Sequence, residues 1–432
     1  MAHIHFIHIY VDSPTTHIQS TWLSPADRQG TGHGTTRYWQ DLARTLERGR
    51  FDGIFIADIQ SIEPEFAKQD IAFGSGIPRH DPLMTLPSMA DVTEHLGFGV
   101  TLSTAGTAPY AAVRRLGTLD NLTGGRLGWN VVTSYQKSDY LALGIDQPDH
   151  DLRYDMADEY LEICRRLWDA FPRDAIIADR DKGVFVDVNK IKRVEFAGKF
   201  FRCEAYPVIE NSPQGRPLIF QAGSSGRGVR FAATHADAIF ALQPTMEAMK
   251  GYLANVGEAA KAVGRPNPKV YLGIQPYIGG TEAEAQARLD FYRDRIPVDV
   301  ALNRLGAVLG IDFRGMDVDR PFDELSSDAG SHGLMRGLVD WGSGAAPTIR
   351  DAALQMSMSS TMPRLVGTPE QLADRIETIW RETGCFGFAL SPHASPQSAE
   401  EFVDQVVPIL QKRGLMRTDY AGTTFRENLN QP

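Results

Sequence analysis

The feature of this sequence that most constrains its fold is a regular alternation of short apolar runs with amphipathic stretches of helical period. The apolar runs are nearly continuous, and strands of that kind are buried on both faces, as in a parallel sheet covered by helices. Eight such units favour a closed (β/α)₈ TIM barrel over an open doubly wound sheet. The eight strands are predicted at residues 4–10, 51–57, 98–104, 126–132, 217–221, 237–242, 269–277 and 386–390.

Two stretches interrupt this alternation. Residues 171–216 are too long for a helix–strand connection, and they contain residues 184–186 and 196–203, which are expected to pair as a hairpin. Residues 294–362 form a second insertion that is rich in Gly, Ser and Asp. Insertions of this length in a barrel usually act as lids, pocket walls or oligomer contacts. We therefore predict one barrel domain over residues 1–432 with two insertions.

Composition excludes several classes of protein. Forty-four Lys and Arg against fifty-four Asp and Glu give a net charge of −10, and without a basic run the chain lacks the footprint of a nucleic-acid-binding protein. No apolar run approaches the ~18 residues of a membrane span, and the first residues lack the layout of a signal peptide. The three cysteines are far apart, without the spacing of a zinc or redox motif. We expect a cytoplasmic protein with reduced thiols that binds neither membrane nor nucleic acid.

Polar residues gather where the predicted strands end. Four successive strands end in polar residues, which are Asp58, the pair Ser103 and Thr104, Asn130 with Thr133 and Ser134 just beyond it, and Gln221. In a parallel barrel the chemistry lies at the carboxyl ends of the strands. Each of these residues taken alone could be a helix cap, which explains Asp58 or Thr104 equally well, but together they predict the floor of a pocket.

A glycine-rich segment after the fifth strand predicts a phosphate site. Gly223, Ser224 and Ser225 open a helix, where backbone N–H groups, hydroxyls and the helix dipole all favour an anion. The segment matches neither the phosphate loop of nucleotide hydrolases nor a dinucleotide fingerprint, so a mononucleotide phosphate fits better than either. The alternative is a flexible turn. His150 and Tyr154, at the start of another helix, form either part of the pocket mouth or a surface cap.

A metal site is not expected. His3 and His5 form a His-x-His pair of the kind that metal-dependent barrel hydrolases use, but this pair lies at the beginning of strand one, on the wrong rim. The later strand ends add no further histidine. The sequence also lacks the Gly-x-Ser-x-Gly motif of an acyl nucleophile.

Segments spread over nearly the whole chain share the pattern of one known family. They include the run Gly-Gly-Arg-Leu-Gly-Trp-Asn-Val-Val-Thr-Ser at residues 124–134, and the others are residues 51–58, 80–97, 114–120, 153–160, 221–225, 407–415 and 426–429. In these segments the chain resembles the bacterial-luciferase-like superfamily of flavin monooxygenases. Within it, the chain is similar to the branch of the nitrilotriacetate monooxygenase large component and dibenzothiophene-sulfone monooxygenase.

The resemblance implies a TIM barrel that binds FMN at the strand ends. Six residues match the family's flavin contacts by position: Asp58, Thr104, Asn130, His150, Tyr154 and Ser225. Ser225 and Tyr154 would hold the phosphate, with Gly223 and Ser224 beside them, and the first three would lie near the isoalloxazine ring. Thr104 and Asn130 are expected to position O₂, and His17 or His150 to handle protons.

The resemblance also implies partners and a reaction. A separate NAD(P)H:FMN oxidoreductase would supply reduced FMN (FMNH₂), and the chain would use O₂ to oxidise a small organic substrate beside a bond such as C–N or C–S. A homodimer or homotetramer is expected. The chain departs from the family pattern at residues 12–34 and in the second insertion, which would form the substrate side of the pocket. Substrate identity therefore stays open.

Two other functions remain alternatives. One is a hydride-transfer oxidoreductase that uses a deazaflavin on the same barrel, and the other is a flavin-binding protein without catalysis. Incorporation of labelled oxygen from O₂ into product separates the first from a monooxygenase, because hydride transfer incorporates none.

Overall fold

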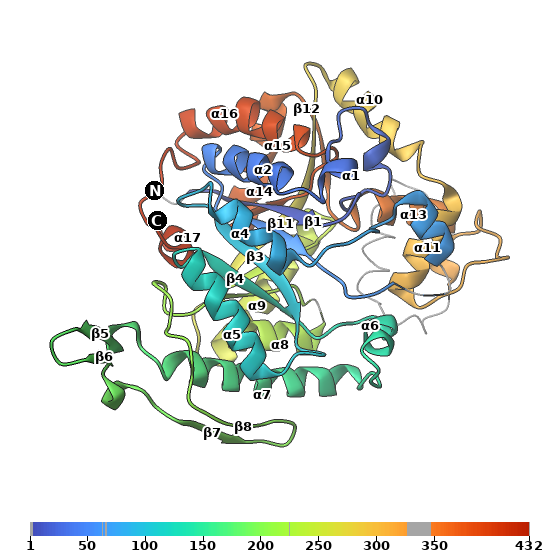
Figure 1. The fold of residues 1–432 in the computed structure, drawn as a ribbon. Coiled ribbons are helices and arrows are strands. Elements are labelled where there is room, and N and C mark those ends of the chain that lie inside the picture. The colour runs from blue at the N-terminus through green and yellow to red at the C-terminus, as the bar shows by residue number, and fades with distance from the viewer. Residues whose placement is uncertain (1–2, 63, 65–66, 224, 326–346, 432) are drawn as a thin grey trace.

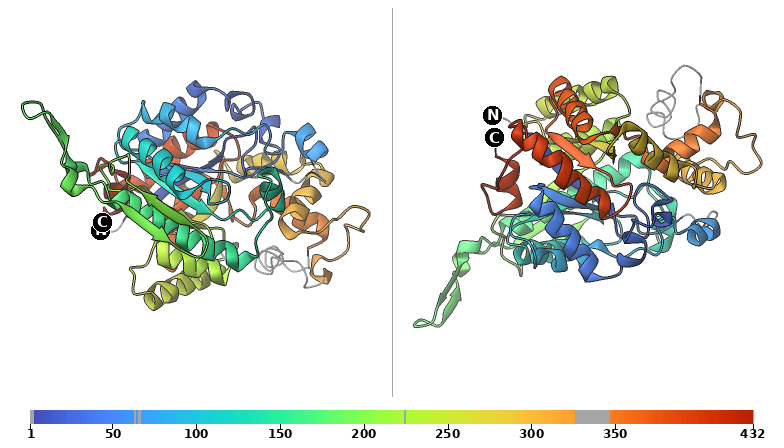
Figure 2. Two further views of the ribbon diagram at one scale, coloured as in Figure 1. Left: turned by 60° about the horizontal axis from the view of Figure 1, so that its bottom comes forward. Right: turned by 90° about the horizontal axis from the view of Figure 1, so that it is seen from above.

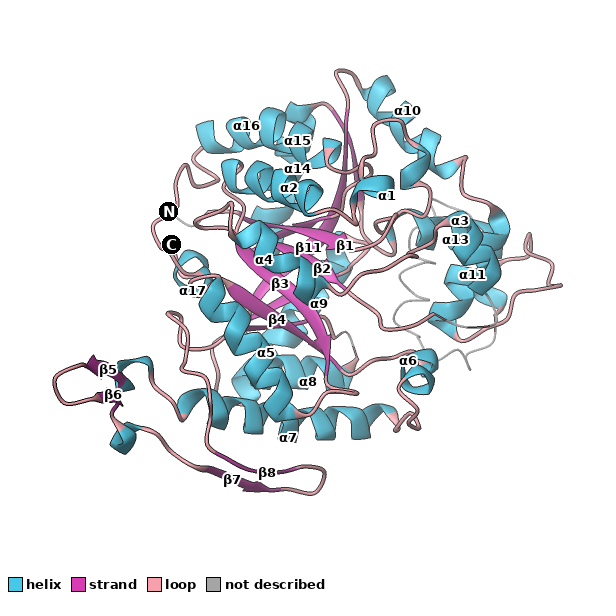
Figure 3. Cartoon of the chain, in the orientation of Figure 1, coloured by secondary structure: helices cyan, strands magenta, loops and turns pink. Residues whose placement is uncertain are grey.

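The computed structural model describes residues 3–62, 64, 67–223, 225–325 and 347–431, and it contains a closed barrel of eight parallel strands (Figures 1 and 3). Each strand pairs with its neighbours in a ring, which the β10–β11 and β1–β13 pairings close. In ring order the strands are β1 (His5–Val11), β2 (Gly53–Ala57), β3 (Gly97–Ser103), β4 (Leu127–Val132), β9 (Leu218–Gln221), β10 (Ala238–Ala241), β11 (Lys269–Ile278) and β13 (Gly387–Leu390). This confirms the predicted TIM barrel, and every predicted strand is found within two residues of its expected bounds.

Helices cover the outside of the barrel because the strands turn every second side chain outward. On β2, Ile54 and Ile56 face the helices, whereas Phe55 faces the lumen. The helices are α1 (Gln29–Gly32), α2 (Thr36–Arg48), α3 (Ala67–Phe73), α4 (Pro82–Ala90), α5 (Pro109–Leu122), α6 (Lys137–Ala142), α7 (His150–Asp169), α8 (Gly226–His235), α9 (Met246–Ala262), α10 (Glu282–Arg293), α11 (Val298–Leu309), α13 (Ile349–Ser359), α14 (Pro369–Thr383), α15 (Gln397–Glu401), α16 (Val407–Lys412) and α17 (Phe425–Leu429). Among the described residues, no helix has the length and apolar character needed to cross a membrane.

Aromatic rings fill the amino-terminal end of the barrel. Phe425, from the last helix, stacks on Phe220 with ring centroids 5.7 Å apart. Glycines on the facing strands make room for these rings, since a Cβ at Gly97 would lie 2.5 Å from Phe425 and one at Gly128 would lie 2.6 Å from Phe220. The amino-terminal end of the barrel lumen is therefore a packed core, and ligand sites of such barrels lie at the carboxyl end.

A buried carboxylate ties the C-terminal segment to this end of the barrel. Asp52 is fully buried, forms an ion pair with Arg417, contacts His5 Nδ1 at 2.9 Å and accepts from Tyr271 Oη at 2.8 Å. Burial alone would raise the pKa of Asp52, but the charge of Arg417 and these hydrogen bonds hold it below its usual value.

Replacing Asp52 with asparagine should destabilise the protein by about 3–5 kcal/mol, because the change leaves the buried Arg417 without its counter-charge. Chemical denaturation monitored by tryptophan fluorescence measures this loss. The exposed Asp91→Asn is the matched control and should change the free energy of unfolding by less than about 0.5 kcal/mol. Equal stabilities of the two variants would contradict the role given to this ion pair.

The first insertion forms two separate hairpins. Strand β5 (Ile176–Asp179) pairs with β6 (Val184–Val186), and β7 (Val194–Ala197) pairs with β8 (Arg202–Ala205). The prediction that residues 184–186 pair with residues 196–203 is therefore wrong. The predicted second strand contains its own turn at residues 198–201, so each strand pairs with its nearest neighbour in sequence. The β5–β6 hairpin projects from the body of the molecule (Figure 2).

The second insertion has its own small core beside the carboxyl end of the barrel. Helices α11 and α13 pack against each other around apolar residues that include Leu305, Phe313 and Met356. Strand β12 (Arg364–Gly367) then extends the sheet along β11. Figure 1 shows α11 and α13 on the side toward which β1 and β3 point. Residues 326–346 of the insertion lie outside the described residues.

Candidate active site

The carboxyl end of the barrel opens into a cavity of about 440 Å³, which we call the mouth cavity. Its polar wall comes from the ends of β2, β3 and β4 and from the loop before α4. Alternation along β3 turns Thr101 and Ser103 toward the lumen. The polar side chains that line it are Asp58, Gln60, Arg79, His80, Asp81, Thr101, Ser103 and Ser134.

Asn130 provides an unsatisfied acceptor beside this cavity. Its Nδ2 donates to Thr101 Oγ1 at 3.0 Å, and the Thr101 hydroxyl donates in turn to the Ile56 carbonyl at 3.0 Å. This chain fixes the orientation of the amide and leaves Asn130 Oδ1 buried with no hydrogen-bond partner among the described residues. Because a buried polar atom without a partner costs free energy, the site is suited to a ligand that donates a hydrogen bond there.

Asp58 directly follows β2 and faces Arg79, with Oδ1 and Nη1 3.6 Å apart. Burial raises the pKa of Asp58 to about 7, although the charge of Arg79 acts in the opposite direction. The carboxyl group therefore changes its protonation state near neutral pH. It can donate a hydrogen bond below this pH and accept one above it.

Replacing Asp58 with asparagine should stabilise the fold increasingly as the pH rises. The pKa of Asp58 rises from 3.8 in the unfolded chain to about 7 in the folded chain. Between these two pH values the folded state binds more protons than the unfolded state, so the wild type loses stability as the pH rises from about 4 to 7. Asparagine does not ionise. The difference in Tm between the variant and the wild type should therefore grow from pH 4 to pH 7 and then level off. The exposed Asp91→Asn should show no such trend, and a constant difference for Asp58→Asn would refute the raised pKa.

Ser134 connects the mouth cavity to α7. Its hydroxyl lies 2.9 Å from Ser103 Oγ, and its carbonyl accepts a hydrogen bond from the Arg153 side chain. The φ of Ser134 is 48°, a left-handed conformation that is costly for a residue with a Cβ and is typical of functional sites. Thr104, by contrast, donates its hydroxyl to the Val132 carbonyl at 3.4 Å and does not line the cavity.

The start of α8 is where the sequence predicts an anion site. Ser225 caps this helix and accepts from the Gly228 amide at 3.0 Å, while the first helical amides, of Gly226 and Arg227, have no carbonyl partner within the helix. His150 Nε2 lies 3.4 Å from Ser225 Oγ. We call Gly223, Ser225, Gly226 and Gly228 the α8 cradle; Ser224 lies outside the described residues.

Tyr154 closes the cradle from α7. A Cβ added at Gly228 would lie 2.9 Å from Tyr154 Oη and 3.0 Å from Ser225 Oγ, so glycine permits both hydroxyls to approach this point. Burial raises the pKa of Tyr154, which keeps the phenol protonated and able to donate a hydrogen bond. Arg227 is held by Asp155 at 2.9 Å and by Asp158 at 2.6 Å, so its charge is already neutralised.

His17 occupies a different part of the mouth. Its Nδ1 lies 3.2 Å from Ser391 Oγ, just beyond the end of β13. Burial lowers the pKa of His17 to about 3, with further contributions from Arg304 and Arg79. His17 is therefore neutral at physiological pH, whereas His150 is half-exposed and contacts Asp151 Oδ1 at 2.7 Å.

The comparisons with known proteins agree with this geometry. The family model described as luciferase-like monooxygenase matches residues 18–385. The chain belongs to the luciferase-like monooxygenase family. It is 35% identical to the dimethyl-sulfide monooxygenase of Hyphomicrobium sulfonivorans over 95% of this chain and 86% of that one. It is 34% identical to nitrilotriacetate monooxygenase component A of Aminobacter aminovorans, over 91% of this chain and 89% of that one.

Solved structures of other luciferase-like monooxygenase relatives superpose closely. The crystal structure of DmoA from Hyphomicrobium sulfonivorans has a TM-score of 0.91 at 34% identity, covering 99% of this chain and 92% of that one. A riboflavin lyase, solved with modified FMN and riboflavin, also gives 0.91, at 30% identity and with 99% and 96% covered. Together these findings confirm the predicted family, its barrel and its monooxygenase class.

Most of the site residues predicted from sequence fall into two groups within this luciferase-like barrel. Asp58 lines the mouth cavity and Asn130 contacts its wall, whereas His150, Tyr154, Gly223 and Ser225 gather at the α8 cradle. Thr104 and His17 belong to neither group, and their roles stay predictions. Ser103 and Ser134, which the sequence placed among the polar residues at strand ends, also line the mouth cavity. Sequence reasoning missed Arg79, because a single arginine in a loop carries no local signal.

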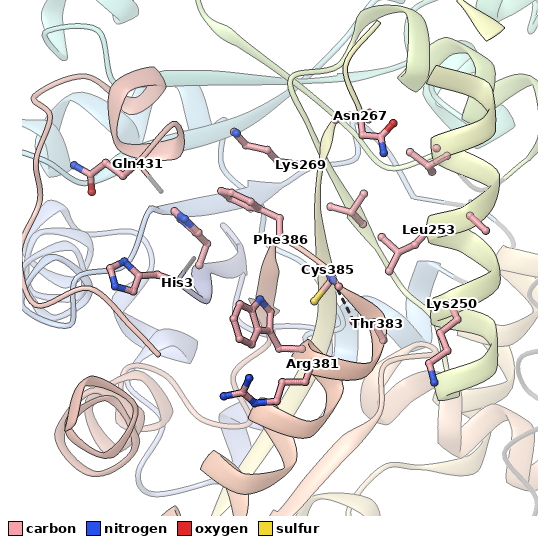
Figure 4. Close-up of a pocket in the computed structure, with 18 residues that line it drawn as sticks. His3, Lys250, Leu253, Asn267, Lys269, Arg381, Thr383, Cys385, Phe386 and Gln431 are labelled. Atoms are coloured by element: carbon pink, nitrogen blue, oxygen red, sulfur yellow. Dashed lines mark hydrogen bonds between the residues drawn. The ribbon is translucent and has the colours of Figure 1, made fainter. Parts of the chain in front are cut away.

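A second cavity, of about 1110 Å³, lies at the opposite end of the barrel (Figure 4). His3, Lys250, Lys269 and Arg381 contribute to its wall, but in the close-up the side chains of Lys250 and Arg381 do not converge with Lys269. Lys250 is paired with Glu382 at 2.9 Å, and Arg381 is paired with Glu377 at 2.8 Å. This cavity therefore lacks a common point for a ligand, and we place the candidate site at the carboxyl end.

Proposed function

We propose that the chain is the oxygenase component of a two-component, FMN-dependent monooxygenase that uses O₂ to oxidise a small organic molecule. The observation that carries this proposal is the arrangement of the carboxyl end, where an unsatisfied amide oxygen of Asn130 lies behind the wall of the mouth cavity and the hydroxyls of Ser225 and Tyr154 meet at the start of α8. The relative named component A supports a separate reductase as the source of FMNH₂. A homodimer or homotetramer in the cytoplasm belongs to the same proposal.

The donors and acceptors on the described residues fit FMN. Ser225, Tyr154 and the amides at the start of α8 offer hydrogen-bond donors and a favourable helix dipole to a phosphate. Asn130 Oδ1 offers an acceptor to an N–H group of the isoalloxazine ring. A series of hydrogen bonds joins the two ends of the site. It runs from Ser103 to Ser134 and from Ser134 to Arg153, which directly precedes Tyr154. A relative solved with modified FMN gives independent support.

Bound FMNH₂ would supply the two electrons that activate O₂, and the protein supplies binding, orientation and electrostatics. In the overall reaction one oxygen atom enters the substrate and the other leaves as water, with the two electrons and two protons coming from FMNH₂. The α8 cradle would hold the phosphate. The Asn130–Thr101 pair would fix the ring against the barrel, and Asp58 would exchange a proton near neutral pH.

The test is a labelled-oxygen experiment. The protein is supplied with chemically reduced FMN, ¹⁸O₂ and a panel of thioethers, sulfones and tertiary amines, and the products are analysed by mass spectrometry. We expect one ¹⁸O atom in the product of at least one compound. Substrate turnover without label would favour hydride transfer. Failure to bind FMN in either redox state would remove the proposal altogether.

A further inference from the structure

Arg304 is a partly buried cation whose donors are poorly used. It lies on α11, where Nε donates to the Met356 carbonyl at 3.3 Å and Nη2 donates to Ser360 Oγ at 3.5 Å. Both distances are long for hydrogen bonds, both acceptors are neutral, and a guanidinium has five N–H donors. These two contacts orient the Arg304 side chain toward the end of α13, but they do not compensate its positive charge, because both acceptors are neutral.

No carboxylate oxygen of a described residue lies within 4.0 Å of the Arg304 guanidinium. Burial lowers the pKa of Arg304, and the groups that act in the opposite direction are Tyr135 and then Asp70, on α3, which forms no ion pair with it. Removing a cation from water is costly unless an anion compensates it. The burial of Arg304 therefore indicates that its counter-ion belongs to a ligand rather than to a residue that the structure describes.

The surroundings of Arg304 place it over the mouth of the barrel. Its charge acts on His17, beyond the end of β13, and on Arg79, which lines the mouth cavity. Arg304 contacts Ser360, and the next residue, Thr361, is held at the carboxyl end of the barrel. The Thr361 hydroxyl donates to the carbonyl of Leu242, just after β10, at 3.3 Å. Ser360 has a φ of 56°, a costly conformation for a serine that the surrounding contacts must hold.

We propose that Arg304 binds a carboxylate or sulfonate group of the substrate and so selects anionic substrates for this monooxygenase. A guanidinium pairs with either group through two parallel hydrogen bonds. Under the proposed function the FMN phosphate belongs to the α8 cradle, so the anion at Arg304, on α11, is a different group. This inference rests on the proposed function and adds the charge of the substrate to it.

The test compares anions with their uncharged counterparts on the FMN-saturated protein and on the flavin-free protein. Isothermal titration uses methanesulfonate against dimethyl sulfone, and propanoate against propanamide. We expect at least one anion to bind at least ten times more tightly than its neutral partner. Arg304→Gln should abolish this preference and Arg304→Lys should retain part of it. The control Arg295→Gln, at an exposed position just before α11, should leave it unchanged.

Two results would overturn the inference. One is the absence of anion binding up to 50 mM, and the other is an unchanged preference for anions in a folded Arg304→Gln protein. A parallel titration with FMN and riboflavin keeps the two proposals distinct. If Arg304→Gln removes the preference for FMN over riboflavin, Arg304 binds the phosphate and the inference is wrong while the function stands. If the wild type binds neither flavin, the proposed function itself fails.

Discussion

Replacing Asn130 with alanine should lower the yield of oxygenated product at least about 100-fold, a loss typical of removing one preorganised polar group from an active site. The amide is fixed by Thr101 and its Oδ1 has no hydrogen-bond partner among the described residues, so alanine would remove the contact that we propose orients the flavin ring. The oxidation of FMNH₂ by O₂ should continue, with the electrons appearing as H₂O₂. The measurement is the ratio of product to flavin oxidised.

Two further variants make the Asn130 result interpretable. Thr101→Val keeps the shape but removes the hydroxyl that positions the amide, so it should reduce coupling less than Asn130→Ala does. Asn255→Ala, at an exposed position on α9, should leave coupling unchanged. If Asn130→Ala gives wild-type coupling, Asn130 has no part in the reaction.

Replacing Gly228 with alanine should weaken FMN binding by about 30- to 100-fold, the effect of losing one or two hydrogen bonds to a charged group. The new Cβ would lie 2.9 Å from Tyr154 Oη and 3.0 Å from Ser225 Oγ, so at least one hydroxyl must leave the cradle. Binding of riboflavin, which lacks the phosphate, should change much less. Fluorescence titration with each flavin measures both affinities.

The matched control for this variant is Gly251→Ala on α9. Apart from its chain neighbours and the backbone of its own helix, no heavy atom of a described residue lies within 4 Å of the Cβ that this change adds, so flavin binding should be unaffected. An equal loss of FMN and riboflavin affinity in Gly228→Ala would show that the substitution disturbs the barrel and not the phosphate site. An unchanged FMN affinity would place the phosphate elsewhere.

The barrel could be predicted from the sequence because its signal is local. Each strand is a short apolar run, and each helix shows its own period, so no knowledge of distant contacts is required. The hairpins of the first insertion were mispaired for the opposite reason. Residues 184–186 and 196–203 have similar β-rich composition, and only the position of the turns decides which strands pair.

The candidate site was predictable in part. Asp58 and Asn130 follow from the rule that polar residues at strand ends meet at one rim, and the α8 cradle follows from its glycines and serines. Arg79 and Arg304 did not stand out, because a single arginine in a loop or helix carries no local signal. Both arginines stand out only in the folded chain, because both are buried there and lie close enough to act on each other's charge, although they are more than two hundred residues apart in the sequence.

The most direct measurement of the central claim is a crystal structure of the protein soaked with FMN. We expect the phosphate within hydrogen-bonding distance of Ser225 and Tyr154 at the start of α8, and a ring N–H donating to Asn130 Oδ1. Flavin bound in the cavity at the amino-terminal end, or crystals that take up no FMN at saturating concentration, would contradict the account.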